Sequence, residues 1–88
     1  MVKTKVYLIR TWCLKFGRIL WIVCDPEGER LARARTESDA LAAWIEEHGS
    51  IDTLQRFKGK MSPSEASMTI ASLRIKAKQL AAPAGGAR

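Results

Sequence analysis

The sequence RILWIVCDPEGERLARAR, residues 18–35, sets the architecture of this chain. Its first part, residues 18–24, is β-branched and aromatic, which is typical of a strand. The four residues DPEG at 25–28 place Asp first, Pro second and Gly last, as a type I turn prefers. A further strand is predicted at 29–35, so the sequence indicates a β-hairpin.

The segment before this hairpin, residues 2–13, is also β-branched and aromatic and predicts a third strand of an antiparallel sheet. Gly17 suits the left-handed end of a three-residue loop that pairs Leu14 with Arg18. If the next turn pairs Asp25 with Glu29, even-numbered residues share one face of the sheet throughout. In this register Cys13 and Cys24 lie on opposite faces, and two free thiols are expected.

Both faces of the predicted sheet are substantially apolar. The even-numbered face carries Val6, Leu8, Arg10, Trp12, Leu20, Ile22, Cys24, Ala32 and Ala34. The odd-numbered face carries Tyr7, Ile9, Thr11, Cys13, Ile19, Trp21, Val23, Leu31, Arg33 and Arg35. The small alanines of the even-numbered face offer a close seat for a helix.

A first helix is predicted over residues 37–48. Thr36 or Ser38 is its N-cap, and Gly49 ends it. Its apolar residues have helical spacing, and Trp44 is expected to be a core anchor.

The C-terminal part predicts a second helix over 63–81, because Ser62-Pro63-Ser64-Glu65 is a capping box with proline at the first helical position. This helix covers part of the odd-numbered face or mediates dimerisation. Apolar residues three apart predict a short helical turn near 51–57. The expected organisation is one α+β domain over residues 1–81, followed by a disordered tail at 82–88.

Charge is unevenly distributed along the 88 residues, whose net charge is +6. The first fifty residues carry eight basic and seven acidic groups, whereas the remainder carries seven basic and two acidic groups. This excess favours a polyanionic partner such as a nucleic acid. The longest apolar run, residues 19–24, is too short to span a membrane. We therefore expect a cytoplasmic protein with no membrane partner.

The residue types that catalysis and metal binding require do not converge in this sequence. Two Cys and one His fall short of a four-ligand zinc site. No phosphate-binding loop or nucleophile elbow is present. His48 falls on the apolar side of a helix end, where a core or capping role is expected. The sequence thus predicts a non-enzymatic protein with no catalytic residue, metal or cofactor.

Two groups of basic residues are candidates for nucleic-acid contacts. Arg33 and Arg35 alternate on the third strand, and a β-sheet can carry Arg into the major groove. The alternative is an edge strand that uses Arg for solubility. The second group consists of Arg56, Lys58, Lys60, Arg74, Lys76 and Lys78. Together these six would form a phosphate-tracking surface, and separately they would be ordinary solvated residues.

Residues 17–49, GRILWIVCDPEGERLARARTESDALAAWIEEHG, resemble the arm-type DNA-binding domain of phage integrases. The matching positions are Trp21, Asp25, Gly28, residues 30–35, Thr36, Ala40 and Trp44. The resemblance implies a three-stranded sheet backed by a helix, with Arg33 and Arg35 contacting bases or phosphates. It favours a small regulatory or accessory protein of a phage or mobile element that binds DNA rather than RNA.

The apolar character of the odd-numbered face favours a second hypothesis. That face needs a cover, which is the last helix, a second copy of the chain or a partner protein. A phage- or plasmid-encoded inhibitor, similar in size and kind to the anti-CRISPR proteins, would use it to block a host protein or nucleoprotein complex. The protein interface predicted by this hypothesis consists of Tyr7, Ile9, Trp21 and Phe57.

Overall fold

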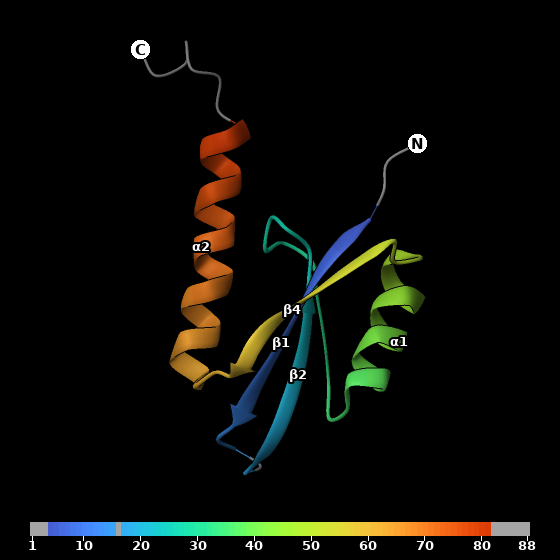
Figure 1. Ribbon diagram of the computed structural model, residues 1–88, viewed down its shortest axis with the longest axis vertical. Coiled ribbons are helices and arrows are strands. Elements are labelled where there is room, and N and C mark those ends of the chain that lie inside the picture. Colours follow the sequence, from blue (N-terminus) through green and yellow to red (C-terminus); the bar gives the residue numbers. More distant parts are fainter. Residues whose placement is uncertain (1–3, 16, 82–88) are drawn as a thin grey trace.

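The structure, a computed structural model, describes residues 4–15 and 17–81. Its elements are β1 (Lys5–Cys13), β2 (Arg18–Cys24), β3 (Leu31–Ala34), α1 (Glu37–His48), β4 (Thr53–Lys60) and α2 (Pro63–Ala81). The strands form one sheet in the order β3-β2-β1-β4, and the two helices lie on opposite sides of it (Figure 1). The α+β class and both long helices are confirmed. The predicted tail at 82–88 lies outside the described residues.

Strand β4 makes the sheet mixed and replaces the helical turn predicted near 51–57. It runs parallel to β1, with Lys5 opposite Thr53 and Arg10 opposite Lys60. The predicted antiparallel pairing of three strands is present in β1, β2 and β3, but the prediction missed this fourth, parallel strand. Apolar side chains three residues apart fit a helical turn, but this segment forms a strand. The neighbouring β1 supplies hydrogen-bonding partners for its backbone N–H and C=O groups.

Leu54 and Phe57 show the consequence of this pairing. Leu54 packs with the core on the α1 side of the sheet, and Phe57 packs with the core on the α2 side. The register shifts between Leu8 and Arg10 of β1, where β4 contains extra residues. Gly59 in this part of β4 has a φ of +69°, a conformation that glycine adopts readily. The bulge turns the end of β4 toward α2.

The turn between β2 and β3 differs from the predicted pairing by one residue. Gly28 N–H donates to Asp25 O at 3.0 Å, as expected for the turn. The Asp25 carboxylate also accepts the backbone N–H groups of Glu29 at 2.8 Å and Arg30 at 3.2 Å. Asp25 N–H in turn donates to Arg30 O. These bonds set Arg30 opposite Asp25, so β3 begins only at Leu31.

The first hairpin shows the same one-residue shift, because Cys13 rather than Leu14 pairs with Arg18. Side chains alternate along a strand, so the two shifts together move only the side chains of β2 to the other face. Trp21 consequently lies on the α1 side, contrary to its predicted face. Cys24 lies on the same face as Cys13 rather than opposite it. Both thiols are free, as predicted.

The core on the α1 side is organised around Trp44, which is 1% exposed. It packs with Val6, Leu8, Val23, Ala32 and Ala40. Thr36 Oγ1 accepts from Asp39 N–H at 3.1 Å, which makes Thr36 the N-cap of α1. The predicted cap and core anchor are confirmed.

The core on the α2 side consists of Ile9, Ile22, Cys24 and Ala66, and α2 packs against β1 above it. Burial, reinforced by the charge of Asp25, raises the pKa of Cys24 to about 12. The thiol is therefore protonated at neutral pH and serves as a small core residue.

The capping box of α2 forms as the sequence predicts. Ser62 N–H donates to Glu65 Oε1 at 3.0 Å, and Glu65 N–H donates to Ser62 Oγ at 3.1 Å. The hydrogen bond from the Ser62 backbone, followed by that with its side chain, lowers the pKa of Glu65. The ionised carboxylate therefore stabilises the start of α2.

We expect Glu65→Gln to lower stability at neutral pH and to have progressively less effect as the pH falls. A carboxylate with a depressed folded-state pKa contributes stability above its ordinary value of 4.5, and that contribution is lost as the pH falls through the folded-state pKa. Urea unfolding of the unaltered protein and of Glu65→Gln, at neutral and acidic pH, measures the difference between their free energies of unfolding. Glu46→Gln, which removes an equal charge from an exposed position of α1, is the control. If this difference in free energy of unfolding did not become smaller on acidification, the assignment of the ionised Glu65 as a stabilising cap of α2 would be contradicted.

Candidate nucleic-acid interface

The two helices leave different parts of the sheet uncovered. Helix α1 packs mainly against β3 and β2, whereas α2 packs against β1 on the opposite face (Figure 1). One uncovered part therefore lies on the α1 side, toward the end of β1 and β4. The other lies on the α2 side, over β2 and β3.

The first uncovered part gathers cations and aromatic rings from three strands. Arg10 is directly opposite Trp21 in the pairing of β1 with β2, and its Cζ lies 5.8 Å from the centroid of that ring. Lys60 is opposite Arg10 on the other side of β1, and its Nζ lies 4.9 Å from the centroid of the Trp12 ring. We call this set, with Arg56, the basic–aromatic surface.

Arg56 completes this surface from β4. It lines a hollow of about 180 Å³ together with Arg10 and Trp21. Its guanidinium forms an ion pair with Glu37 in the first turn of α1, and the hydrogen bond and charge of Glu37 raise the pKa of Arg56. One carboxylate thus orients a cation at the rim of the hollow.

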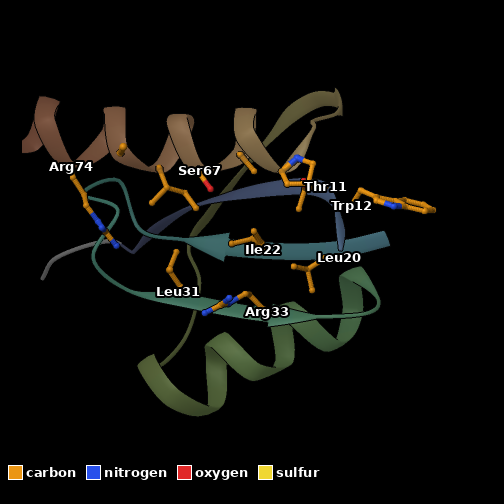
Figure 2. Close-up of a pocket in the computed structure, with 12 residues that line it drawn as sticks. Thr11, Trp12, Leu20, Ile22, Leu31, Arg33, Ser67 and Arg74 are labelled. Carbon is orange, nitrogen blue, oxygen red and sulfur yellow. The ribbon is translucent and has the colours of Figure 1, made fainter. Parts of the chain in front are cut away.

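Trp12 lies where β1 ends and is 36% exposed. Figure 2 shows its ring projecting from the end of the sheet. An exposed indole beside a lysine offers both a stacking surface and a positive charge. These are the two groups that proteins use to hold unpaired bases and their phosphates.

Sequence reasoning missed Arg10 as a site residue, because it is a single cation in an apolar strand. Its alternation with Trp12 was visible in the sequence. Its position opposite Trp21 was not, since the predicted register put Trp21 on the other face. The correct pairing of β1 with β2 turns an isolated cation into the centre of a cluster.

The six basic residues of the predicted phosphate-tracking group are not brought together. Arg56 and Lys60 lie on the α1 side, whereas Arg74 lies on the α2 side, where its Nε donates to Gly28 O at 2.7 Å. The sheet stands between these positions. Lys58 is exposed on β4, and Lys76 and Lys78 are exposed on α2.

The predicted group on the third strand also changes its surroundings. Arg33 is exposed on β3 and lines a groove on the α2 side with Arg74. The predicted register placed Arg33 and Trp21 on the same face of the sheet, but in the structure they lie on opposite faces. Arg35 is exposed immediately after β3, just before the cap of α1. Arg33 thus lines the same groove as a cation of α2.

The protein interface predicted on the odd-numbered face is largely occupied by the chain's own last helix. Ile9 is 0% exposed, so it is inaccessible to a partner. Tyr7 and Phe57 are half-buried and pack against each other, with ring centroids 5.4 Å apart. The sequence left three possible covers for this face, and over β1 the cover is the last helix, α2.

The described residues contain no group of three or more His, Cys, Asp or Glu side chains that could hold a metal ion. The ring of His48 lies 4.5 Å from that of Trp44, inside the packing of α1. Within the same residues, no helix is both long and apolar enough to cross a membrane.

Comparison with known proteins identifies no relative of this chain. No protein-family model matches the chain, and neither a curated protein nor a solved structure matches it. The resemblance of residues 17–49 to the integrase arm-type domain therefore stays a prediction.

Proposed function

We propose that this protein binds DNA without enzymatic activity, as a small regulatory or accessory protein of a phage or mobile element. The observation that carries the proposal is the convergence of Arg10, Arg56 and Lys60 with two tryptophan rings on a part of the sheet that neither helix covers. Cationic side chains neutralise phosphates, and the net charge of +6 attracts a polyanion from a distance.

The aromatic part of the surface favours single-stranded DNA over duplex. Base stacking on a side chain is open only to bases that are not already stacked in a helix, and it contributes roughly 1–3 kcal/mol per base. Trp12 has the exposure that stacking requires, and Lys60 lies beside its ring to meet a phosphate.

Salt titrations followed by fluorescence anisotropy test this function with labelled single-stranded DNA, duplex DNA and structured RNA. We expect single-stranded DNA to bind most tightly, with affinity that falls steeply as salt rises. Trp12→Ala is expected to weaken this binding by about 5- to 150-fold, the equivalent of roughly 1–3 kcal/mol, and to leave the salt dependence unchanged.

A pair of charge-matched double variants locates the surface. Arg10→Ala with Lys60→Ala should reduce the slope of log affinity against log salt by about one for each phosphate that these side chains no longer neutralise. Lys76→Ala with Lys78→Ala removes the same charge from exposed positions of α2 and should have a smaller effect. Equal reductions in the two variants would contradict the assigned surface. Absence of binding by the unaltered protein near physiological salt would overturn the function.

A further inference from the structure

The second uncovered part of the sheet forms a groove beside α2, with a cavity of about 360 Å³. Figure 2 shows this groove between the helix and strands β2 and β3. Its floor includes Leu20, Ile22 and Leu31, and Thr11 and Trp12 of β1 line it as well. Its wall is one continuous face of α2, formed by Pro63, Ala66, Ser67, Ile70, Ala71 and Arg74.

The dimensions of this face leave room for a second helix. Neighbouring strands are about 4.8 Å apart, so four strands are roughly as wide as two helices of about 10 Å diameter lying side by side. Helix α2 takes the place above β1. The place above β2 and β3 is the groove, and the small side chains of Ser67 and Ala71 on its wall permit close approach by another helix.

The charge of the groove is one-sided. Arg33 and Arg74 line it, and none of the described residues that line it is acidic. The Arg74 Nε is held by Gly28 O, which positions its guanidinium at one end of the groove. Arg33 is exposed, and within the described part of the chain it has no hydrogen-bonding or ion-pair partner.

We propose that the groove binds an amphipathic helix of a partner protein, with acidic residues flanking its apolar stripe. The apolar side chains of that helix would cover the floor, and its carboxylates would pair with Arg33 and Arg74. A second copy of this chain fits less well, because its net charge is +6 and α2 is itself basic. The acidic helix of this chain, α1, already uses Trp44 and Ala40 in its own core.

A designed peptide tests the proposal on the complete chain. The probe is a fluorescent peptide of about five helical turns, with leucine at positions i, i+3, i+4 and i+7 and glutamate on both sides of that stripe. A second peptide has lysine in place of every glutamate. We expect the glutamate peptide to bind with a dissociation constant of about 10 μM and the lysine peptide to bind at least about tenfold more weakly.

Two variants of α2 show where the peptide binds. Ala71→Trp places a large side chain in the groove from an exposed position, and we expect it to weaken binding of the glutamate peptide at least about tenfold. Met68→Trp is the matched control, because Met68 is 68% exposed and does not line the groove. Arg33→Glu should weaken binding of the glutamate peptide and strengthen that of the lysine peptide.

Three results would overturn the proposal. They are equal binding of the two peptides, equal effects of the two tryptophan variants, or a dimer by light scattering that Ala71→Trp dissociates. The last result would assign the groove to a second copy of the chain. Single-stranded DNA binding by Ala71→Trp is measured in parallel, because this variant replaces no residue of the basic–aromatic surface. Trp12, which belongs to that surface and also lines the groove, is unchanged in it. Failure of peptide binding in the groove is therefore distinguishable from failure of the DNA-binding function.

Discussion

Replacing Trp44 with alanine is expected to lower the free energy of unfolding by about 3–5 kcal/mol. The side chain is 1% exposed and joins α1 to three strands through its contacts with Leu8, Val23 and Ala32. Its removal leaves a cavity that the surrounding sheet cannot fill. Native proteins have a total stability of roughly 5–15 kcal/mol, so this single change removes a large fraction of the total.

Urea unfolding followed by circular dichroism measures this destabilisation. Ile45→Ala is the control, because Ile45 is the next residue of α1 and is 49% exposed. We expect Ile45→Ala to lower the free energy of unfolding by less than about 1 kcal/mol. Trp44→Phe should be milder than Trp44→Ala, because the indole Nε1 of Trp44 is buried without a hydrogen-bond partner in the described part of the chain. A similar cost for Trp44→Ala and Ile45→Ala would contradict the central role of Trp44.

Gly28→Ala is expected to lower the free energy of unfolding by about 2–5 kcal/mol, because backbone strain and a steric clash act together. Gly28 has a φ of +67°, a region that disfavours any residue with a Cβ. A Cβ at this position would also lie 2.8 Å from Ile70 O of α2. The helix would have to move away from the turn, which would disturb the bond from Arg74 to Gly28 O.

Gly17→Ala separates these two contributions. Gly17 has a similar φ of +60°, but a Cβ there would meet no atom of the described residues within 4 Å. We therefore expect Gly17→Ala to show the strain alone, about 1–2 kcal/mol, in the same urea unfolding experiment. The additional destabilisation in Gly28→Ala measures how tightly α2 is held against the turn. Equal costs for the two variants would mean that α2 yields to the new methyl group at no cost in stability.

Local features of the fold were predictable because their determinants lie within a few residues of one another. The caps at Thr36 and Ser62 each depend on a side-chain oxygen that accepts a backbone N–H three positions away. The turn ending at Gly28 is closed by a backbone bond over the same separation. These signals located α1, α2 and the second hairpin. They carry no information about which strands pair across the sheet.

The faces of β2 show how a small local difference has a large consequence. The predicted turn pairs Asp25 with Glu29, but the Asp25 carboxylate binds two backbone N–H groups and sets Arg30 opposite instead. A shift of one residue reverses every side chain of a strand. The matching shift in the first hairpin, where Cys13 pairs with Arg18, moves Trp21 to the face of Arg10, and a cluster forms that the predicted register does not contain.

The amino-acid sequence was sufficient for the α+β class, the helix boundaries, the central role of Trp44 and the excess of positive charge. Only the tertiary structure placed β4 beside β1, separated Arg56 from Arg74 and brought Arg33 to the groove of Arg74. Caps and turns depend on neighbours in the chain, whereas strand pairing and surface clusters depend on residues tens of positions apart. The energies of such distant contacts exist only once the sheet has formed, so no local pattern encodes them.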